Sequence, residues 1–262
     1  MSDWLHNLPV PWMALVVFGF TYVLAAVIYV VIMRLAAAGL GKTFKSVSVG
    51  MLPILGIIFG LFVAFIAAQV WGDNDRATAA VSQEAGALRS ALVFAKSFRG
   101  EPEDKLRGLV HDYVREAANA EWPMMGHQTA SLGTTPRPLA DALQFVLSLT
   151  PDGPGQQTAQ HEIINAIEHA LEARRQRIII SLAEVNLVKW VCLYLQAMSV
   201  LLAIAIVHHE DSGASLIALT LFATGVAASV LLIAAHDRPF IGQLSVKPDL
   251  LLQIMPGAGG GR

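Results

Sequence analysis

The chain has 262 residues, of which 55% are hydrophobic and 15% are charged, and its formal net charge is −2. Soluble domains usually carry more charge than this, and a chain without a basic excess gives no reason to expect nucleic acid as a partner. Cys192 is the only cysteine, which excludes a disulfide framework within the chain and a cysteine-based metal site.

Four apolar stretches are each long enough to cross a bilayer, because about 20 residues in a helix rise about 30 Å. They cover residues 12–33, 48–71, 187–207 and 214–235. Their one charged residue is Lys189, near one end of the third stretch. We favour a side chain that snorkels to the membrane interface over an ion ligand there. The sequence therefore predicts an all-α integral membrane protein with four spans.

These spans divide the chain into five segments. They are an N-terminal segment (1–11), a transmembrane hairpin (12–71), a helical extramembrane domain (72–186), a second hairpin (187–235) and a C-terminal tail (236–262). No positive charge precedes the first span and no small-residue cleavage site follows it, which argues against a removed signal peptide. We expect residues 257–262 to be disordered, because they are mostly glycine.

The second span carries two different stripes at helical spacing. Small residues recur every four positions at Gly56, Gly60, Ala64 and Ala68, which indicates a seam that another helix can approach closely. A largely opposite set is bulky, with Gln69 one turn beyond its last aromatic residue. Its members are Ile54, Ile58, Phe62, Phe65 and Gln69. Lipid contact is the ordinary role for such a stripe, but in a symmetric oligomer it would form a hydrophobic constriction around an axis.

The extramembrane segment has the apolar periodicity of helices. A stripe from Ala77 to Ala95 predicts a helix over residues 74–98, with Asp73 and Asp75 as its N-terminal caps. Residues from 103 onward predict a second helix, residues 122–138 a loop, and residues 139–149 a short helix. No Pro or Gly occurs from residue 157 to residue 212, which predicts one helix running unbroken into the third span.

Basic residues near the membrane ends favour a cytoplasmic extramembrane domain by six against three. The six are Arg76, Arg174, Arg175, Arg177, Arg238 and Lys247, and the three are Arg34, Lys42 and Lys45. For the run from Arg174 to Arg177 we expect contact with anionic lipid or solvation. Attraction of anions toward a pore mouth is the alternative.

Metal and catalytic patterns are weak. The succession His208, His209, Glu210 and Asp211 has donors for a metal, but a solvated turn explains four adjacent residues better. Asp73 and Asp75 lack the glycine and glutamate of a calcium loop. No nucleophile motif or phosphate loop accompanies the polar residues, so we expect no enzyme activity, no metal and no cofactor.

Two parts of the sequence resemble a bacterial family called bestrophin-like. The segment 81–89, residues 106–113 and Glu121–Trp122–Pro123 resemble its domain between the second and third spans, and the run Asp-Arg-Pro-Phe-Ile-Gly from residue 237 resembles its exit from the fourth span. The motif residues are Glu84, Ala85, Arg89, Glu121, Trp122, Pro123, Asp237, Pro239, Phe240 and Gly242. The resemblance covers about residues 71–249.

True bestrophins, a more distant resemblance, are pentameric anion channels with a narrow apolar neck on the second span. The resemblance implies a homo-oligomer of that plan in a bacterial inner membrane, with Ile58, Phe62 and Phe65 as neck candidates and Gln69 at the pore mouth. No acidic cluster follows the fourth span, so the resemblance does not extend to calcium gating.

Our leading hypothesis is therefore a homo-oligomeric, channel-like membrane protein that conducts small ions, with anions preferred by resemblance. The alternative is a non-conducting scaffold or sensor whose helical domain binds a partner, with Glu84, Arg89, Glu121 and Trp122 as contact candidates. A closed ring with an axial opening favours conduction, and a monomer or compact dimer favours the scaffold. In both cases the apolar spans contact membrane lipid.

Overall fold

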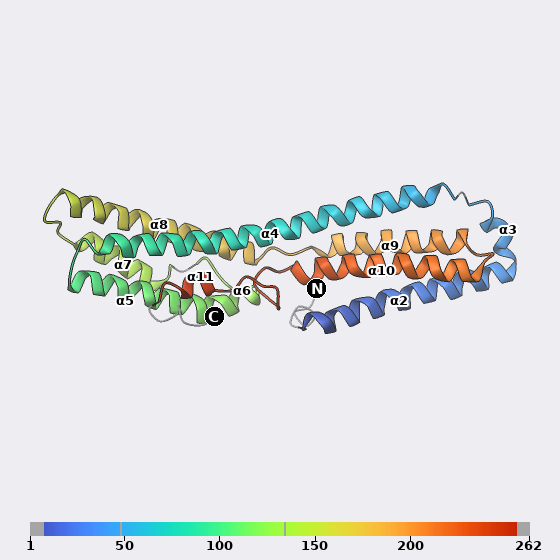
Figure 1. Cartoon of the computed structure of the whole chain (residues 1–262), viewed down its shortest axis with the longest axis horizontal. Helices are drawn as coiled ribbons and strands as arrows, with labels where there is room; N and C mark the ends of the chain where they lie inside the picture. The colour runs from blue at the N-terminus through green and yellow to red at the C-terminus, as the bar shows by residue number, and fades with distance from the viewer. Residues whose placement is uncertain (1–7, 48, 134, 256–262) are drawn as a thin grey trace. The chain divides into compact units, whose positions relative to one another are not determined.

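A computed structural model describes residues 8–47, 49–133 and 135–255, and within these ranges it contains helices and turns but no strand. The chain divides into two compact units (Figure 1). The membrane unit is formed by the described residues of Met1–Gly72 and Glu184–Asp237, and the helical unit by those of Asp73–Ala183 and Arg238–Arg262. The predicted disordered end, residues 257–262, lies outside the described residues, as does the predicted start of the second span at Ser48.

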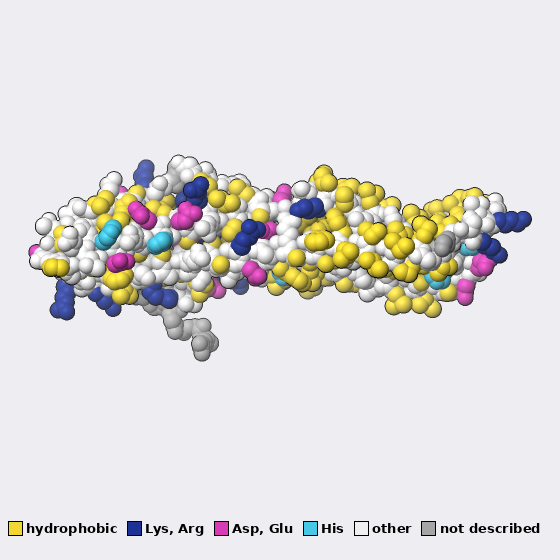
Figure 2. Space-filling view, turned by 90° about the horizontal axis from the view of Figure 1, so that it is seen from above, with side chains coloured by type: hydrophobic (Ala, Val, Ile, Leu, Met, Phe, Trp, Pro, Cys, Tyr) yellow, Lys and Arg dark blue, Asp and Glu magenta, His cyan; other side chains and the backbone are white. Residues whose placement is uncertain are grey.

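Four helices of the chain are long and apolar enough to cross a membrane, as the sequence predicts. They are α2 (Val10–Leu35), which continues through η1 (Ala36–Leu40) and α3 (Gly41–Phe44), α4 (Met51–Ala95), α9 (Leu187–Val207) and α10 (Ser212–His236). Hydrophobic side chains cover most of the visible face of the membrane unit, whereas charged side chains are scattered over the helical unit (Figure 2).

The core of the membrane unit forms where α2 and α9 pack against α10. Small side chains such as Ala205, Ala223 and Ala227 are fully buried there, which lets the helix backbones approach closely. Helix α4 joins this core through Phe59, whose ring centroid lies 5.5 Å from that of Phe222 on α10. The membrane unit is therefore held together by apolar packing.

The predicted turn at His208–Asp211 is confirmed, since α9 ends at Val207 and α10 begins at Ser212. The Asp211 carboxylate caps α10 by accepting hydrogen bonds from the backbone N–H groups of Gly213 and Ala214, at 2.9 and 3.0 Å. Glu210 pairs with Lys45 at 2.5 Å, and the lysine lowers the pKa of this carboxyl group. The Lys45–Glu210 pair joins the two short interhelical connections of the membrane unit.

The helical unit consists of the second half of α4 and six further helices. They are α5 (Glu101–Glu116), η2 (Ala117–Glu121), α6 (Trp122–Gly126), α7 (Arg137–Ser148), α8 (Pro154–Ser181) and α11 (Asp249–Leu252). Helix α7 packs against both α5 and α8. Leucine and isoleucine side chains from several helices form the core, among them Leu88, Leu106, Leu139 and Ile163, which are all buried. On α5, for example, Leu106, Val110 and Tyr113 are buried at spacings of three and four residues, which gives this helix one apolar face.

The predicted start of a helix at residue 74 is wrong. No helix begins at Asp73 or Asp75, because α4 runs unbroken from Met51 to Ala95. Buried positions of the membrane stretch continue into Ala77 and Ala80 at the same helical spacing, so the periodicity never resets. Asp73 is buried and pairs with Arg76 one turn along the same helix, so it is an ion-pair partner and caps no helix.

The predicted continuous helix into the third span is also wrong, because α8 ends at Ser181 and α9 begins at Leu187. Asn186 caps α9 by accepting a hydrogen bond from the Lys189 backbone N–H at 3.0 Å. The Asp237 carboxylate accepts another from the Val185 backbone N–H at 2.6 Å. The break between α8 and α9 is thus held by hydrogen bonds to two side chains, and no Pro or Gly marks it in the sequence.

The loop predicted for residues 122–138 is shorter than expected. Its first five residues form α6, in which Pro123 occupies the first turn. Since α6 continues directly from the π-helical turn η2, Pro123, which has no backbone N–H, lies where the wider π-helical turn passes into α-helix. The short helix predicted for residues 139–149 is confirmed as α7, which begins at Arg137.

Candidate functional site

The membrane part of α4 has one face that packs within its own chain. Phe59, Ile66, Ala67 and Val70 are buried in the core of the membrane unit. Sequence analysis did not single out this face, although its residues recur at helical spacing. Besides the two predicted stripes, α4 therefore has a third face, which packs against other helices of its own chain.

The small-residue stripe makes little contact within the chain. Gly60, Ala64 and Ala68 are exposed and Gly56 is half-buried. A methyl group added at Gly56 or Gly60 would meet no atom within 4 Å. The seam predicted from these residues therefore has no partner helix among the described residues of the same chain. It stays a prediction for contact between copies.

The bulky stripe is also largely open. Phe65 is 75% exposed and Ile58 is 48% exposed, whereas Phe62 is half-buried against the core. Gln69 is half-buried as well. With 3.6 residues per turn, the core face, the small stripe and the bulky stripe lie about 100–140° apart around α4. Each of the three faces can thus meet a different environment.

Lys189 has a partner that the sequence did not reveal. Its ammonium group donates a hydrogen bond to the side-chain oxygen of Gln69 on α4. Sequence analysis treated Gln69 as part of one stripe and Lys189 as a snorkelling side chain, with no relation between them. The structure instead joins a positive charge to the end of the bulky stripe.

A second set of polar residues lies buried inside the helical unit. The guanidinium of Arg177 binds both carboxylate oxygens of Glu84, with its Nε 2.7 Å from Oε2 and its Nη2 3.0 Å from Oε1. The same Nη2 lies 3.0 Å from Glu121, which also pairs with Arg174 at 2.5 Å. Tyr113 donates its hydroxyl proton to Glu84. We call these five residues the buried charge network. The two positive charges of its arginines equal the two negative charges of its glutamates.

The electrostatics of the buried charge network favour this arrangement. Burial raises the pKa of Tyr113 well above its usual value, and the negative charge of Glu84 raises it further. Burial alone would lower the pKa of Arg177, but Glu84, Tyr113 and Glu121 outweigh it and raise this pKa. Tyr113 therefore stays neutral and Arg177 stays charged. The guanidinium carbon of Arg177 lies over the indole ring of Trp122, 4.6 Å from the ring centroid.

The basic run from Arg174 to Arg177 is thus not a lipid-binding or solvated patch. Arg174 and Arg177 are buried in the network, and only Arg175 and its neighbour Gln176 are exposed. Glu84 is fully buried too. Its position, three residues after Val81 and four before Leu88, is the signal that could have placed it on the buried face.

The motif residues after the fourth span contribute to the packing within each unit. In the helical unit, Phe240 packs edge-on against Trp122 at 5.8 Å, and the Trp122 indole N–H donates to the carbonyl of Val246 at 3.0 Å. Pro239 and Ala85 are buried, Arg89 and Pro123 are exposed, and Gly242 has φ +90°, a conformation that favours glycine. Asp237 holds the α9 entry within the membrane unit. The buried members of this set therefore contribute to the packing of their own unit.

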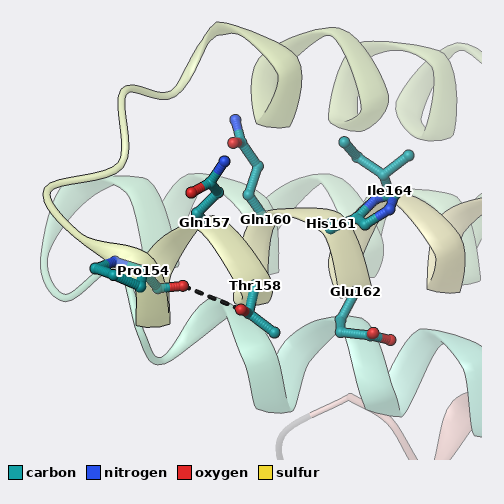
Figure 3. A pocket seen from close by; sticks show the side chains of 7 residues that line it. All are labelled: Pro154, Gln157, Thr158, Gln160, His161, Glu162 and Ile164. Carbon is teal, nitrogen blue, oxygen red and sulfur yellow. Dashed lines mark hydrogen bonds between the residues drawn. The ribbon is translucent and has the colours of Figure 1, made fainter.

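An open hollow of about 490 Å³ lies at the start of α8. In Figure 3, Gln157 and Gln160 point to one side of the helix, and Thr158 and Glu162 point to the other. Thr158 donates its hydroxyl proton to the carbonyl of Pro154 at 3.0 Å. Because the polar groups do not converge, this hollow has no geometry for catalysis or metal binding. Among the described residues, no group of three His, Cys, Asp or Glu side chains could hold a metal ion.

The fold and these sites define a four-span, all-α membrane protein with a helical extramembrane unit. A model of the Bestrophin-like domain matches residues 19–251, so the chain belongs to the Bestrophin-like family, as the sequence motifs indicated. No curated protein matches the chain significantly.

Solved structures agree with this assignment. Two crystal structures of variants of a bacterial bestrophin homologue from Klebsiella pneumoniae are similar to the chain, each with a TM-score of 0.72 and 13% sequence identity. The first alignment covers 90% of this chain and 97% of that protein, and the second covers 90% and 96%. At this identity the likeness establishes the bestrophin fold.

Proposed function

We propose that this protein is a homo-oligomeric, channel-like membrane protein that conducts small ions through a pore lined by α4. The main support for this proposal is that α4 has one face packed in its own chain and two free faces. One free face consists of small residues and the other of bulky apolar residues. A helix at the wall of a ring needs three such faces: one for its own chain, one for a neighbouring copy and one for the axis.

In this assembly the small stripe of Gly56, Gly60, Ala64 and Ala68 contacts the neighbouring copy, because small residues permit close approach of helices in a membrane. The bulky stripe then turns Ile58, Phe62 and Phe65 to the axis, where apolar rings constrict the path and gate it by dewetting. Gln69 lies at its mouth. The family resemblance supports a pentamer, and the remaining apolar faces contact lipid.

We place the protein in a bacterial inner membrane with the helical unit in the cytoplasm. Two of the six basic residues that support this orientation, Arg174 and Arg177, belong to the buried charge network. The positive-inside argument counts Lys and Arg residues near the span ends whether or not they are buried in the folded protein, so the count stays at six against three. Conduction needs no covalent chemistry, so the proposal includes no enzymatic step and no cofactor.

Purified protein reconstituted into planar bilayers tests the proposal. We expect single-channel currents, and a larger current for Phe65→Ala, because removal of the most exposed ring of the stripe widens the constriction. Phe20→Ala is the matched control, since Phe20 on α2 is 55% exposed but does not belong to α4. Absence of current across varied salts and voltages would contradict conduction, and a compact dimer without an axial opening would favour the non-conducting scaffold.

A further inference from the structure

Lys189 is the only Asp, Glu, Lys or Arg residue within 12–33, 48–71, 187–207 and 214–235. A charge at such a position is expensive and is therefore usually retained for a function. If the lysine simply snorkelled to the lipid headgroups, it would extend away from the protein. Its position in the structure is different.

The side chain of Lys189 is turned toward α4. It is half-buried, whereas its apolar neighbours Leu187 and Val188 are 75% and 67% exposed. Its ammonium group donates to the oxygen of Gln69, four residues and so about one helical turn after Phe65. The charge therefore lies at the end of the bulky stripe and away from the surface that Leu187 and Val188 present.

The charge of Lys189 is not neutralised by this contact. Gln69 is an uncharged amide, and among the described residues no carboxylate forms an ion pair with the lysine. By contrast, Lys45 in the first connection pairs with Glu210. A positive charge without a counter-ion beside a low-dielectric wall raises the local concentration of anions and lowers that of cations.

We propose that Lys189, positioned by Gln69, sets the charge selectivity of the conduction path and makes it prefer small inorganic anions such as chloride. This inference rests on the proposed function, because it requires that the bulky stripe lines a pore. In a ring of copies, each subunit contributes one lysine at the same height, so their fields add at the mouth. Gln69 is then a positioning residue.

Reversal potentials across a tenfold KCl gradient test the inference on full-length protein in planar bilayers. We expect wild type to be anion-selective, Lys189→Arg to keep this preference, and Lys189→Gln to lower the ratio of chloride to potassium permeability on the order of tenfold. Lys45→Gln is the control, since Lys45 lies in the connection between α3 and α4 and already has a carboxylate partner; the permeability ratio of this variant should not change. Gln69→Leu should lower the ratio less than Lys189→Gln, because the charge remains but is no longer held.

Chemical restoration of the positive charge at position 189 distinguishes an effect of the charge from an effect of misfolding. In a Cys192→Ser background, Lys189→Cys has one reactive thiol, and aminoethylation with a methanethiosulfonate reagent restores an ammonium group. Recovery of the chloride preference on aminoethylation supports the inference. Currents whose reversal potential is the same in Lys189→Gln as in wild type would overturn it alone, and a wild-type protein that conducts nothing would overturn the proposed function together with it.

Discussion

The membrane unit and the helical unit are stabilised in different ways. The membrane unit is packed from apolar side chains, and Lys189, the one charged residue within its four apolar stretches, has an amide partner. The helical unit joins two arginines and two glutamates in a single network beside its apolar core, and of these four side chains only Glu121 is partly exposed. Buried ion pairs are sensitive to loss of one partner, because the remaining charge stays buried. Apolar packing between membrane helices has no such dependence on a single atom, so mutations should affect the two units differently.

The largest expected effect is at Arg177. Arg177→Met leaves Glu84 without its cation, and loss of one partner of a buried pair costs about 3–5 kcal/mol. Arg175→Met changes an exposed neighbour on the same helix and should cost little. Thermal unfolding of the purified full-length variants in detergent measures the difference. Equal midpoints for the two variants would show that the buried charge network contributes little to stability.

In the membrane unit, Phe59→Ala and Phe65→Ala form a matched pair on one helix. Phe59 is buried against Phe222, so its removal leaves a cavity. We expect a cost of about 2–3 kcal/mol, below the 3–5 kcal/mol of soluble cores, because lipid is as apolar as the site. Phe65→Ala should leave the stability nearly unchanged and alter conduction. A larger loss of stability in Phe65→Ala would mean that the bulky stripe is a packing face.

Tyr113→Phe removes the hydroxyl that donates to Glu84 and should cost about 1–2 kcal/mol at neutral pH. Because the pKa of Tyr113 is raised in the folded state, its contribution is complete below its unfolded pKa of about 10 and is lost as the pH rises above that value. Wild-type stability should therefore fall more steeply above pH 10 than that of the variant. Parallel pH profiles would contradict a neutral, hydrogen-bonded Tyr113.

The smallest expected effect is at the break between α8 and α9. Asn186→Ala removes the cap of α9 and should cost about 1 kcal/mol. Because the loss is local, hydrogen exchange of the first amides of α9 should accelerate while the helical unit stays protected. Slow exchange equal to wild type would indicate that Asp237, through its bond to Val185, holds the start of α9 alone.

Much of the fold could be predicted from this sequence, because span length and helical periodicity are local properties. The four spans follow from uninterrupted apolar stretches, and the end of α9 at Val207 follows from the polar turn after it. The break at residues 182–186 could not be predicted in the same way. It depends on hydrogen bonds to Asn186 and to Asp237, of which the latter is 52 residues away from Val185.

The candidate site shows the same limit. The two stripes of α4 are visible in the sequence, but the partner of Gln69 lies 120 residues away on another helix. Likewise, the sequence alone predicts a surface position for the basic run at 174–177, whereas the structure pairs Arg174 and Arg177 with Glu121 and Glu84. Pairings between distant residues depend on tertiary structure, which periodicity alone does not encode.

Electron cryo-microscopy of the assembled particle in lipid nanodiscs tests the central claim most directly. We expect a closed ring of copies in which Ile58, Phe62 and Phe65 surround an axial opening, with Gly56 and Gly60 against the adjacent copy. A particle in which those side chains contact lipid, with no opening between the copies, would contradict the proposed role of α4.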